Sequence, residues 1–197
     1  GGTHQPDFVR THEKISQDIF LKIHAKGLFT KKATQQLFDE QAQQFLPDRY
    51  VRGTCPVCGS DNAYGDQCEG CGRAMDAMSL VKPVSTLTGA TPVPRQTTHW
   101  FMRLDRLQRP LADWLRSKKD PATAGAHWRA TVINQSLGRI DAEGLPERAM
   151  TRDMTWGIPV PLDDPDAKGK VLYVWFDAPI GYVSFTVQHL AAQGRDP

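Results

Sequence analysis

Four cysteines, arranged as two Cys-x-x-Cys pairs, are the residues of this chain with the clearest chemical role. Cys55 and Cys58 form the first pair, Cys68 and Cys71 form the second, and nine residues separate the pairs. Thiolates at this spacing are typical ligands of tetrahedral Zn²⁺. Four cysteine ligands leave no open position for water or substrate, so the pattern predicts one structural zinc ion within residues 53–73.

A glycine directly follows each cysteine pair. Gly59 and Gly72 can adopt positive φ, which would let each turn fold back and direct backbone N–H groups at sulfur. Two disulfides in a secreted domain are the alternative use of four cysteines. Long stretches without cysteine argue against a disulfide-stapled scaffold, and we therefore expect a reducing, cytoplasmic setting.

The overall composition sets few further limits. The 24 basic residues nearly balance the 22 acidic ones, and the resulting net charge of +2 neither requires nor excludes a nucleic-acid partner. No apolar run approaches the roughly 18 residues of a membrane span, so we expect a soluble protein. The histidines are scattered along the sequence, and we assign none of them to catalysis.

A second segment with chemical potential lies near the end of the sequence. The run Lys170–Phe176 is continuously apolar and aromatic, which predicts a strand buried on both faces of a parallel sheet. Asp177 is expected to cap a following helix that holds Pro179 in its first turn. Such turns lie at the ligand-binding edge of α/β sheets. Trp175 and Tyr182 could flank a ligand there, although core packing is the simpler explanation of two aromatic residues.

Other elements must hold these two segments in place. Ile15, Ile19 and Ile23 predict a helix over Thr11–Gly27, with Thr11 as its N-cap and Gly27 at its end. Residues 28–50 are expected to form a hairpin or short elements. Strands are predicted at Met78–Pro83 and His99–Leu104, in a small sheet beside the zinc loops. Two core-facing helices are predicted from the stripes Leu104, Leu107, Leu111, Leu115 and Trp128, Val132, Ile133, Leu137.

Several stretches, in one order, resemble the methionyl-tRNA synthetases, a family of class I aminoacyl-tRNA synthetases. They are Thr11–Phe20, Phe45–Tyr50, the Cys-Pro-x-Cys-Gly knuckle, Ser85–Pro92, Thr151–Pro159 and Tyr173–Tyr182. No single stretch decides the resemblance, but their common order leaves little room for chance, and together they cover nearly the whole chain.

The resemblance implies an α/β fold class and a longer parent protein. The expected architecture is a partial Rossmann-type catalytic domain interrupted by an α+β connective-peptide insertion that carries the zinc knuckle. On this basis residues 1–27 end the first half of the catalytic domain, residues 28–150 form the insertion, and residues 151–197 begin the second half.

The resemblance also implies the activity and its site. The full-length protein is expected to activate methionine with ATP and Mg²⁺ and to transfer it to tRNA(Met). Trp175, Ala178, Pro179 and Tyr182 are implied to line the methionine pocket. Arg152 is implied to act in amino-acid activation by holding an acidic partner that is not in this chain. The His-Ile-Gly-His and Lys-Met-Ser-Lys-Ser signatures of ATP binding do not occur in this sequence. We therefore expect the chain alone to be inactive.

Two alternatives to this assignment differ in what they explain. A non-enzymatic zinc ribbon that binds nucleic acid or protein explains the cysteines and the pairs Lys31-Lys32 and Lys118-Lys119, but not the Asp-Ala-Pro-Ile-Gly-Tyr segment. A synthetase for valine, isoleucine or leucine would share the Trp-Gly-Ile-Pro segment. Its editing insertion would be much larger than residues 28–150.

Overall fold

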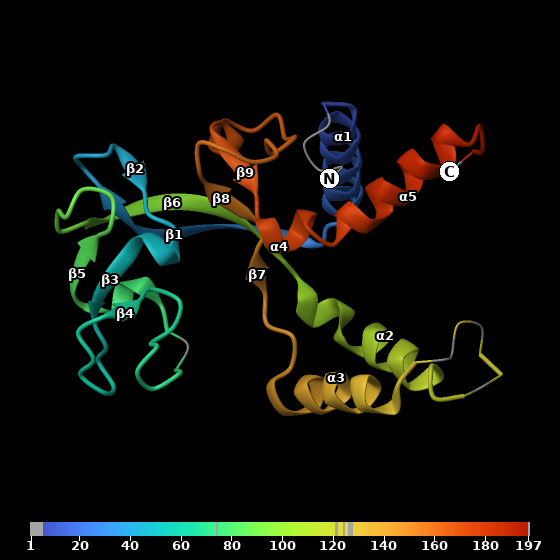
Figure 1. Cartoon of the computed structure of the whole chain (residues 1–197), viewed down its shortest axis with the longest axis horizontal. Helices are drawn as coiled ribbons and strands as arrows, with labels where there is room; N and C mark the ends of the chain where they lie inside the picture. Colours follow the sequence, from blue (N-terminus) through green and yellow to red (C-terminus); the bar gives the residue numbers. More distant parts are fainter. Residues whose placement is uncertain (1–5, 74, 121, 124, 126–127, 197) are drawn as a thin grey trace.

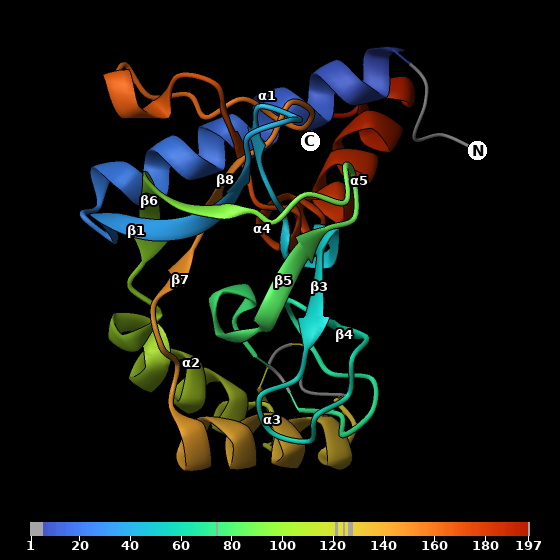
Figure 2. The same ribbon diagram turned by 90° about the vertical axis from the view of Figure 1, so that its left-hand side faces the viewer.

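The structure, a computed structural model, describes residues 6–73, 75–120, 122–123, 125 and 128–196. Helices and strands are mixed, and they are arranged around two long antiparallel strands, β1 (Phe29–Asp39) and β6 (Val93–Met102) (Figure 1). In Figure 2 the terminal helices α1 and α5 lie at one end of the molecule and helices α2 and α3 at the other. None of the described helices combines the length and apolar character that crossing a bilayer requires.

Strands β1 and β6 form the centre of a four-stranded sheet with the order β2-β1-β6-β7. They pair over ten positions, from Phe29 opposite Met102 to Phe38 opposite Val93. The edge strands β2 (Gln44–Phe45) and β7 (Arg148–Ala149) are short. The sequence predicted a hairpin or short elements for residues 28–50, and β1 and β2 do form an antiparallel hairpin. The length of β1 was not predicted, because part of it has helical composition; pairing with β6 overrides that preference.

A small lobe of residues 46–85, the cysteine lobe, follows β2. It contains a three-stranded sheet of β3 (Val51–Thr54), β4 (Ala63–Tyr64) and β5 (Val81–Ser85), with the 3₁₀ helices η1 (Asp48–Tyr50) and η2 (Ala77–Ser79). The strand predicted from residue 78 starts later, because Asp76 accepts a hydrogen bond from the N–H of Met78 and caps η2. Buried residues of the core beneath this lobe are Leu37, Leu46, Val51, Cys55, Ala63, Cys68, Ala77 and Leu80.

Helices α2 (Leu104–Ser117) and α3 (Ala130–Glu143) form a helical arm between β6 and β7. Both predicted helices are confirmed, and Leu115, Ile133 and Leu137 pack in the arm's own core. Trp128 was predicted to face the core, but it is 43% exposed and its ring meets the ring of Trp114 edge to face. Val132 of the same stripe and Leu111 of the other predicted stripe are exposed as well, and Trp128 precedes α3. The pattern therefore located both helices correctly but assigned these three residues to the core wrongly.

Helix α1 (Pro6–Ala25) packs along α5 (Ile180–Ala192), although most of the chain separates them. Phe20 of α1 is fully buried in the core beneath β6, where its ring stacks on that of Phe29. The predicted helix is confirmed, but it begins before Thr11, which lies inside it rather than at its N-cap. Gly27 follows the helix with a φ of 66°, as expected for a residue that ends a helix.

The end of the chain differs from the prediction of a long buried strand. Strand β9 (Lys170–Leu172) is short and pairs antiparallel with β8 (Thr151–Asp153), and a short helix, α4 (Val174–Asp177), follows it. Asp177 lies inside α4 and does not cap α5, whose N-cap is Pro179 without a side-chain hydrogen bond. The error has a physical origin, because a short apolar run has no periodicity that distinguishes a buried strand from a helix.

The expected sheet beside the zinc loops is also wrong. His99 belongs to the β1–β6 sheet, while the cysteines lie in loops of the separate sheet β4-β3-β5. His99 instead faces strand β8. The connection between β8 and β9 contains the 3₁₀ helix η3 (Pro165–Ala167), and Asp164 caps that helix through the N–H of Asp166.

Candidate functional site

The four cysteines lie in two similar turns of the cysteine lobe. The N–H of Gly59 donates to the carbonyl of Cys55 at 3.0 Å, and the N–H of Gly72 donates to the carbonyl of Cys68 at 2.7 Å. The φ angles of the two glycines are 74° and 70°, a conformation that side chains with a Cβ rarely adopt. The positive φ predicted for both glycines is confirmed.

The sulfur atoms of all four cysteines converge, within 4.8 Å of one another. The Sγ atoms of Cys58 and Cys68 are 3.6 Å apart, close to the roughly 3.8 Å edge of a tetrahedron with Zn–S bonds of about 2.3 Å. The backbone N–H groups of Cys58 and Val57 lower the pKa of Cys55 to about 7. All four residues are free cysteines, which excludes the disulfide alternative. The donor set therefore fits a metal ion with four thiolate ligands.

Arg152, the candidate catalytic residue, lies in the middle of β8. Its guanidinium carbon is 3.8 Å from the ring centroid of Tyr173, and its Nη1 donates to the carbonyls of Ala149 and Thr151 at 3.0 and 2.8 Å. Burial lowers the pKa of Arg152, while nearby groups that include Asp48 act in the opposite direction. Arg152 stays positively charged, because an arginine keeps its proton in proteins. Asp48 is thus an acidic neighbour within the chain.

The opposite face of β8 carries a buried polar cluster that sequence reasoning did not predict. Thr151 and Asp153 flank Arg152, and side chains alternate between the faces of a strand, so both point away from it. His99 is fully buried against them. Its Nδ1 is 3.0 Å from Oγ1 of Thr151, and its Nε2 approaches Oδ2 of Asp153 at 3.3 Å without the alignment of a full hydrogen bond.

Strand β9 completes this cluster with a buried ion pair. Lys170 donates to Oδ1 of Asp153 and, at 2.7 Å, to Oγ1 of Thr97, whose hydroxyl in turn donates to Oδ2 of Asp153 at 2.6 Å. Both charges are therefore paired and hydrogen-bonded, as buried charges must be. We call the five residues Thr97, His99, Thr151, Asp153 and Lys170 the His99 cluster.

One signal in the sequence could have pointed to the His99 cluster. Thr97 and His99 are two residues apart, and so are Thr151 and Asp153, which is the spacing that places both members of a pair on one strand face. Neither pair indicates its partner strand, however. His99 and Thr151 are 52 positions apart in the chain.

Stability at acidic pH is expected to depend on Asp153. Burial alone would raise its pKa, but the close approach of His99, the hydrogen bonds from Lys170 and Thr97 and the charge of Lys170 lower the pKa from 3.8 to about 2. Because the folded pKa is the lower one, Asp153 stabilises the fold above pH 3.8, and this contribution, about 2 kcal/mol, is lost as the pH falls towards 2.

The measurement is denaturant unfolding of the wild type and of Asp153→Asn at several pH values between 5 and 2. The wild type should lose about 2 kcal/mol more than the variant over this range. Parallel pH profiles of the two proteins would contradict this account of Asp153.

The residues expected to line a methionine pocket lie on α4, on α5 and between them. Trp175 is 69% exposed and Tyr182 is 80% exposed, so core packing within this chain does not explain them. Ala178 and Pro179 have helical backbone angles and connect the two helices. Other exposed apolar side chains of the two helices are Val174, Val183 and Phe185. Exposed apolar side chains gathered in this way are typical of a surface that binds something.

Ala178 also lines a cavity of about 500 Å³ between α1 and α5, together with Phe8 and His12. Oδ1 of Asp177 is buried here and has no hydrogen-bond partner in the part of the chain that the structure describes, and burial raises the pKa of this carboxyl. The structure therefore does not bring the four predicted pocket residues into one closed pocket, because Trp175 and Tyr182 lie exposed while Ala178 faces α1.

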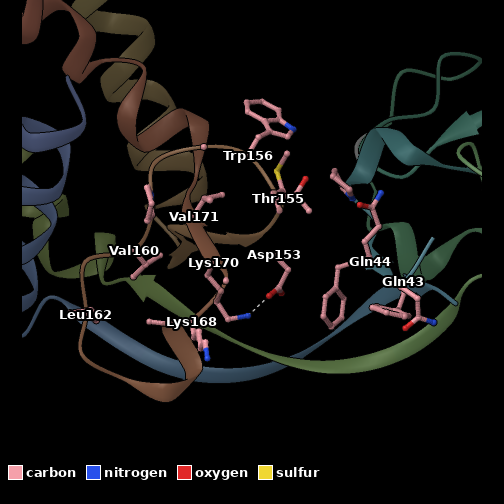
Figure 3. A pocket seen from close by; sticks show the side chains of 18 of the residues that line it. Gln43, Gln44, Asp153, Thr155, Trp156, Val160, Leu162, Lys168, Lys170 and Val171 are labelled. Carbon is pink, nitrogen blue, oxygen red and sulfur yellow. Dashed lines mark hydrogen bonds and ion pairs between the residues drawn. The ribbon is translucent and has the colours of Figure 1, made fainter. Parts of the chain in front are cut away.

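A larger cleft, of about 1270 Å³, lies between the β1–β2 hairpin and the segment 153–171. Figure 3 shows Gln44 on one side of it, Val160 on the other, and the paired side chains of Asp153 and Lys170 between them. The cleft thus reaches the His99 cluster from the solvent side. None of the predicted methionine-pocket residues lines it.

Comparisons with known proteins agree along nearly the whole chain. The family described as tRNA synthetases class I (M) matches residues 3–197. The methionine–tRNA ligase of Chloroherpeton thalassium is 48% identical over 93% of this chain and 25% of that protein. The methionine–tRNA ligase of Thermococcus onnurineus is 47% identical over 94% of this chain and 24% of that protein. The chain thus spans about a quarter of the length of the curated relatives it matches.

Solved structures show the same fold. A methionyl-tRNA synthetase of Mycobacterium tuberculosis bound by methionyl-adenylate aligns with a TM-score of 0.51 and 18% identity, over 92% of this chain and 28% of that one. A second structure of that enzyme in complex with methionyl-adenylate gives a TM-score of 0.52, also at 18% identity, over 93% and 29% of the two chains. The predicted fold class, a mixed α/β part of a class I synthetase, is confirmed.

Proposed function

We propose, because this chain belongs to the class I tRNA synthetase (M) family, that it is part of a methionine–tRNA ligase. The observation that carries the proposal is the identity of 45–48% to proteins named methionine–tRNA ligase over more than nine tenths of the chain. In the full-length protein, methionine and ATP would be the substrates of activation and tRNA(Met) the acceptor, a reaction that takes place in the cytoplasm.

We assign the domains as the sequence suggested. Residues 1–27 would end the first half of the catalytic domain, residues 28–150 would form the connective-peptide insertion, and residues 151–197 would begin the second half. Contacts between the two terminal parts support the division. Nδ1 of His12 is 2.9 Å from Oγ of Ser184, and the rings of Phe8 and Phe185 stack with centroids 4.2 Å apart. The chain leaves one unit and returns to it after the insertion.

The exposed aromatic residues are assigned to the methionine pocket. Trp175 and Tyr182 would contact the thioether of methionine, and Ala178 and Pro179 would shape the turn between them. A sulfur–aromatic contact contributes about 0.3–1.5 kcal/mol, and a wall fitted to the terminal methyl discriminates against shorter side chains by about 1–3 kcal/mol. Both aromatic rings are highly exposed in this chain. Such exposure is expected of residues on one wall of a pocket when neither the opposite wall nor the ligand covers them.

Arg152 is assigned a role in activation. In this reaction a carboxylate oxygen of methionine attacks the α-phosphorus of ATP, and pyrophosphate leaves. The ribose hydroxyl of the terminal tRNA adenosine then attacks the carbonyl carbon of the adenylate, and AMP leaves. Positioning and electrostatic stabilisation drive both steps. A fixed positive charge beside the methionine segment, held over the Tyr173 ring, would orient an acidic group that binds the substrate ammonium.

One zinc ion is assigned to Cys55, Cys58, Cys68 and Cys71, whose sulfur atoms have the required separation. When bound, it would supply a rigid tetrahedral link between the two turns and no catalytic chemistry, since a site of four thiolates offers no free coordination position. ATP and Mg²⁺ would act as substrate and its counter-ion in the full-length protein.

The test is exchange of labelled pyrophosphate into ATP by the full-length protein, with methionine, leucine, isoleucine or valine as the amino acid. We expect exchange with methionine and no more than background with the other three. Exchange that depends on leucine, isoleucine or valine would reassign the substrate, and exchange with none of the four would reject the proposed activity. The 197-residue chain by itself should not exceed the background without protein.

A further inference from the structure

The His99 cluster connects the strand that carries Arg152 to the long strand β6. A neutral imidazole and an ion pair are costly to bury unless their polar atoms find partners. Here the partners come from three strands: Thr97 and His99 from β6, Thr151 and Asp153 from β8, and Lys170 from β9. The cluster therefore restrains the strands relative to one another more strictly than apolar packing does.

Among the residues that the structure describes, His99 is the one whose side chain contacts both side chains on either side of Arg152. Its two ring nitrogens face Thr151 and Asp153 at 3.0 and 3.3 Å. Because these residues lie two apart on one strand face, a single rigid ring in contact with both restricts rotation of β8 about its own axis, in addition to the backbone pairing of β8 with β9. Any rotation of β8 would swing the side chain of Arg152, which projects from the other face.

The proton positions follow from the partners. A carboxylate only accepts hydrogen bonds, so a neutral His99 must carry its proton on Nε2, towards Asp153. Its Nδ1 then accepts from the hydroxyl of Thr151, whose oxygen in turn accepts the backbone N–H of Trp100 at 3.2 Å. Burial, the largest influence, lowers the pKa of His99, in agreement with a neutral ring.

The other face of β8 leads directly to the methionine segment. The guanidinium of Arg152 lies over the ring of Tyr173, and the N–H of Tyr173 donates to the carbonyl of Met150 at 2.9 Å. Tyr173 is the N-cap of α4, the helix that contains Trp175. A change in the position of Arg152 relative to Tyr173 is therefore a change relative to the proposed pocket.

We propose that His99 is a positioning residue for methionine activation: by holding Thr151 and Asp153 from strand β6, it fixes the side chain of Arg152 beside the methionine segment. This inference rests on the proposed function. His99 lies on β6, within the proposed insertion. The insertion would thus help to position a residue of the activation site, although the imidazole of His99 does not itself contact the substrate.

The test uses conservative variants of the full-length protein in methionine-dependent pyrophosphate exchange. His99→Asn can keep the contact to Thr151, His99→Gln can keep the contact to Asp153, and His99→Ala keeps neither. We expect kcat to fall about 10–100-fold for His99→Ala, because displacing a catalytic side chain by about 1 Å can reduce the rate by that much. His99→Asn and His99→Gln should each restore part of the lost kcat. The KM for ATP should change less than twofold.

A stability control separates positioning from general weakening of the fold. Ile133→Ala removes a buried side chain of the helical arm, away from β8, and is expected to destabilise the protein by about 2–5 kcal/mol. Assayed at a temperature where thermal melts show every variant folded, Ile133→Ala should keep the wild-type kcat. If it loses activity as the His99 variants do, the effect of His99 is one of stability and the inference fails.

Coupling to Arg152 is the decisive measurement. If His99 acts through Arg152, then His99→Asn should reduce kcat less than twofold further in a protein that already carries Arg152→Lys. Fully additive losses, or wild-type kcat in His99→Ala, would overturn the inference while the wild-type protein remains an active methionine-dependent enzyme. An inactive wild type would overturn the proposed function as well, which distinguishes the two failures.

Discussion

Removing the metal, or replacing Cys68 by serine, is expected to unfold the cysteine lobe while helices α1 and α5 stay folded. Among the described residues, the core beneath this lobe contains eight buried ones, two of them cysteines, and its other members are aliphatic residues of small to medium size. Such a core does not offset the conformational entropy of ordering the lobe. Zinc binding by four thiolates contributes roughly 10–16 kcal/mol in small modules at pH 7 and would supply the difference.

Hydrogen exchange measured by mass spectrometry, together with metal analysis, checks this result. The protein should contain one zinc ion per chain, and a chelator that removes it should abolish amide protection over residues 51–85 and leave α1 protected. Val57→Ala is the matched control, since Val57 is exposed within the first cysteine turn and is not a sulfur ligand. It should keep both metal and protection. Unchanged protection after complete loss of metal would show that the lobe folds without it.

Replacing Trp175 by alanine in the full-length protein is expected to raise the KM for methionine by about 10–100-fold in pyrophosphate exchange. The variant loses both the sulfur–aromatic contact and the wall against the terminal methyl group, together about 1.3–4.5 kcal/mol, and a 10–100-fold change corresponds to about 1.4–2.7 kcal/mol within that range. Tyr182→Ala should act in the same direction. Because both rings are mostly exposed in this chain, their removal should change the free energy of unfolding by no more than about 0.5 kcal/mol.

The matched control for Trp175→Ala is Trp128→Ala on the helical arm. Trp128 is also an exposed tryptophan, but it contacts Trp114 and lies on an element without proposed pocket residues. It should leave the KM for methionine unchanged. A wild-type KM in both Trp175→Ala and Tyr182→Ala would remove these residues from the pocket.

The parts of the site that could be predicted from sequence are those set by local spacing. The conformation of each Cys-x-x-Cys-Gly turn is determined by residues within the turn itself. The convergence of the four sulfur atoms and the positive φ of Gly59 and Gly72 could therefore be predicted from the sequence. The three longest helices of the prediction also formed, since their apolar periodicity is local. In each case the partners lie within a few residues of one another.

The prediction failed where a distant partner decides the structure. Residues 33–38 extend because β6 pairs with them, and Val174–Asp177 coil into a helix because pairing with β8 ends at Leu172. The His99 cluster joins three strands whose pairing no local pattern reveals. The pattern alone favoured core packing for Trp175, and only its exposure of 69% shows that it does not pack in a core within this chain. Periodicity indicates which face of a segment is apolar, but it does not indicate which other segment or ligand that face will contact.

The pairing of β1, β6 and β7 also decides where this chain can change in length over evolutionary time. The excursion that contains β2 and the cysteine lobe departs after Phe38 and returns to the sheet at Val93, and these two residues are directly paired. The helical arm departs at Met102 and returns at Arg148, another direct pair. Each excursion therefore begins and ends at a pair of residues that lie directly opposite each other in the sheet. Doubling the length of such a loop raises the free energy of loop closure by only about 0.6 kcal/mol. Descendants of this sequence can enlarge, trim or exchange either module at small thermodynamic cost, while the strand that carries Arg152 keeps its place.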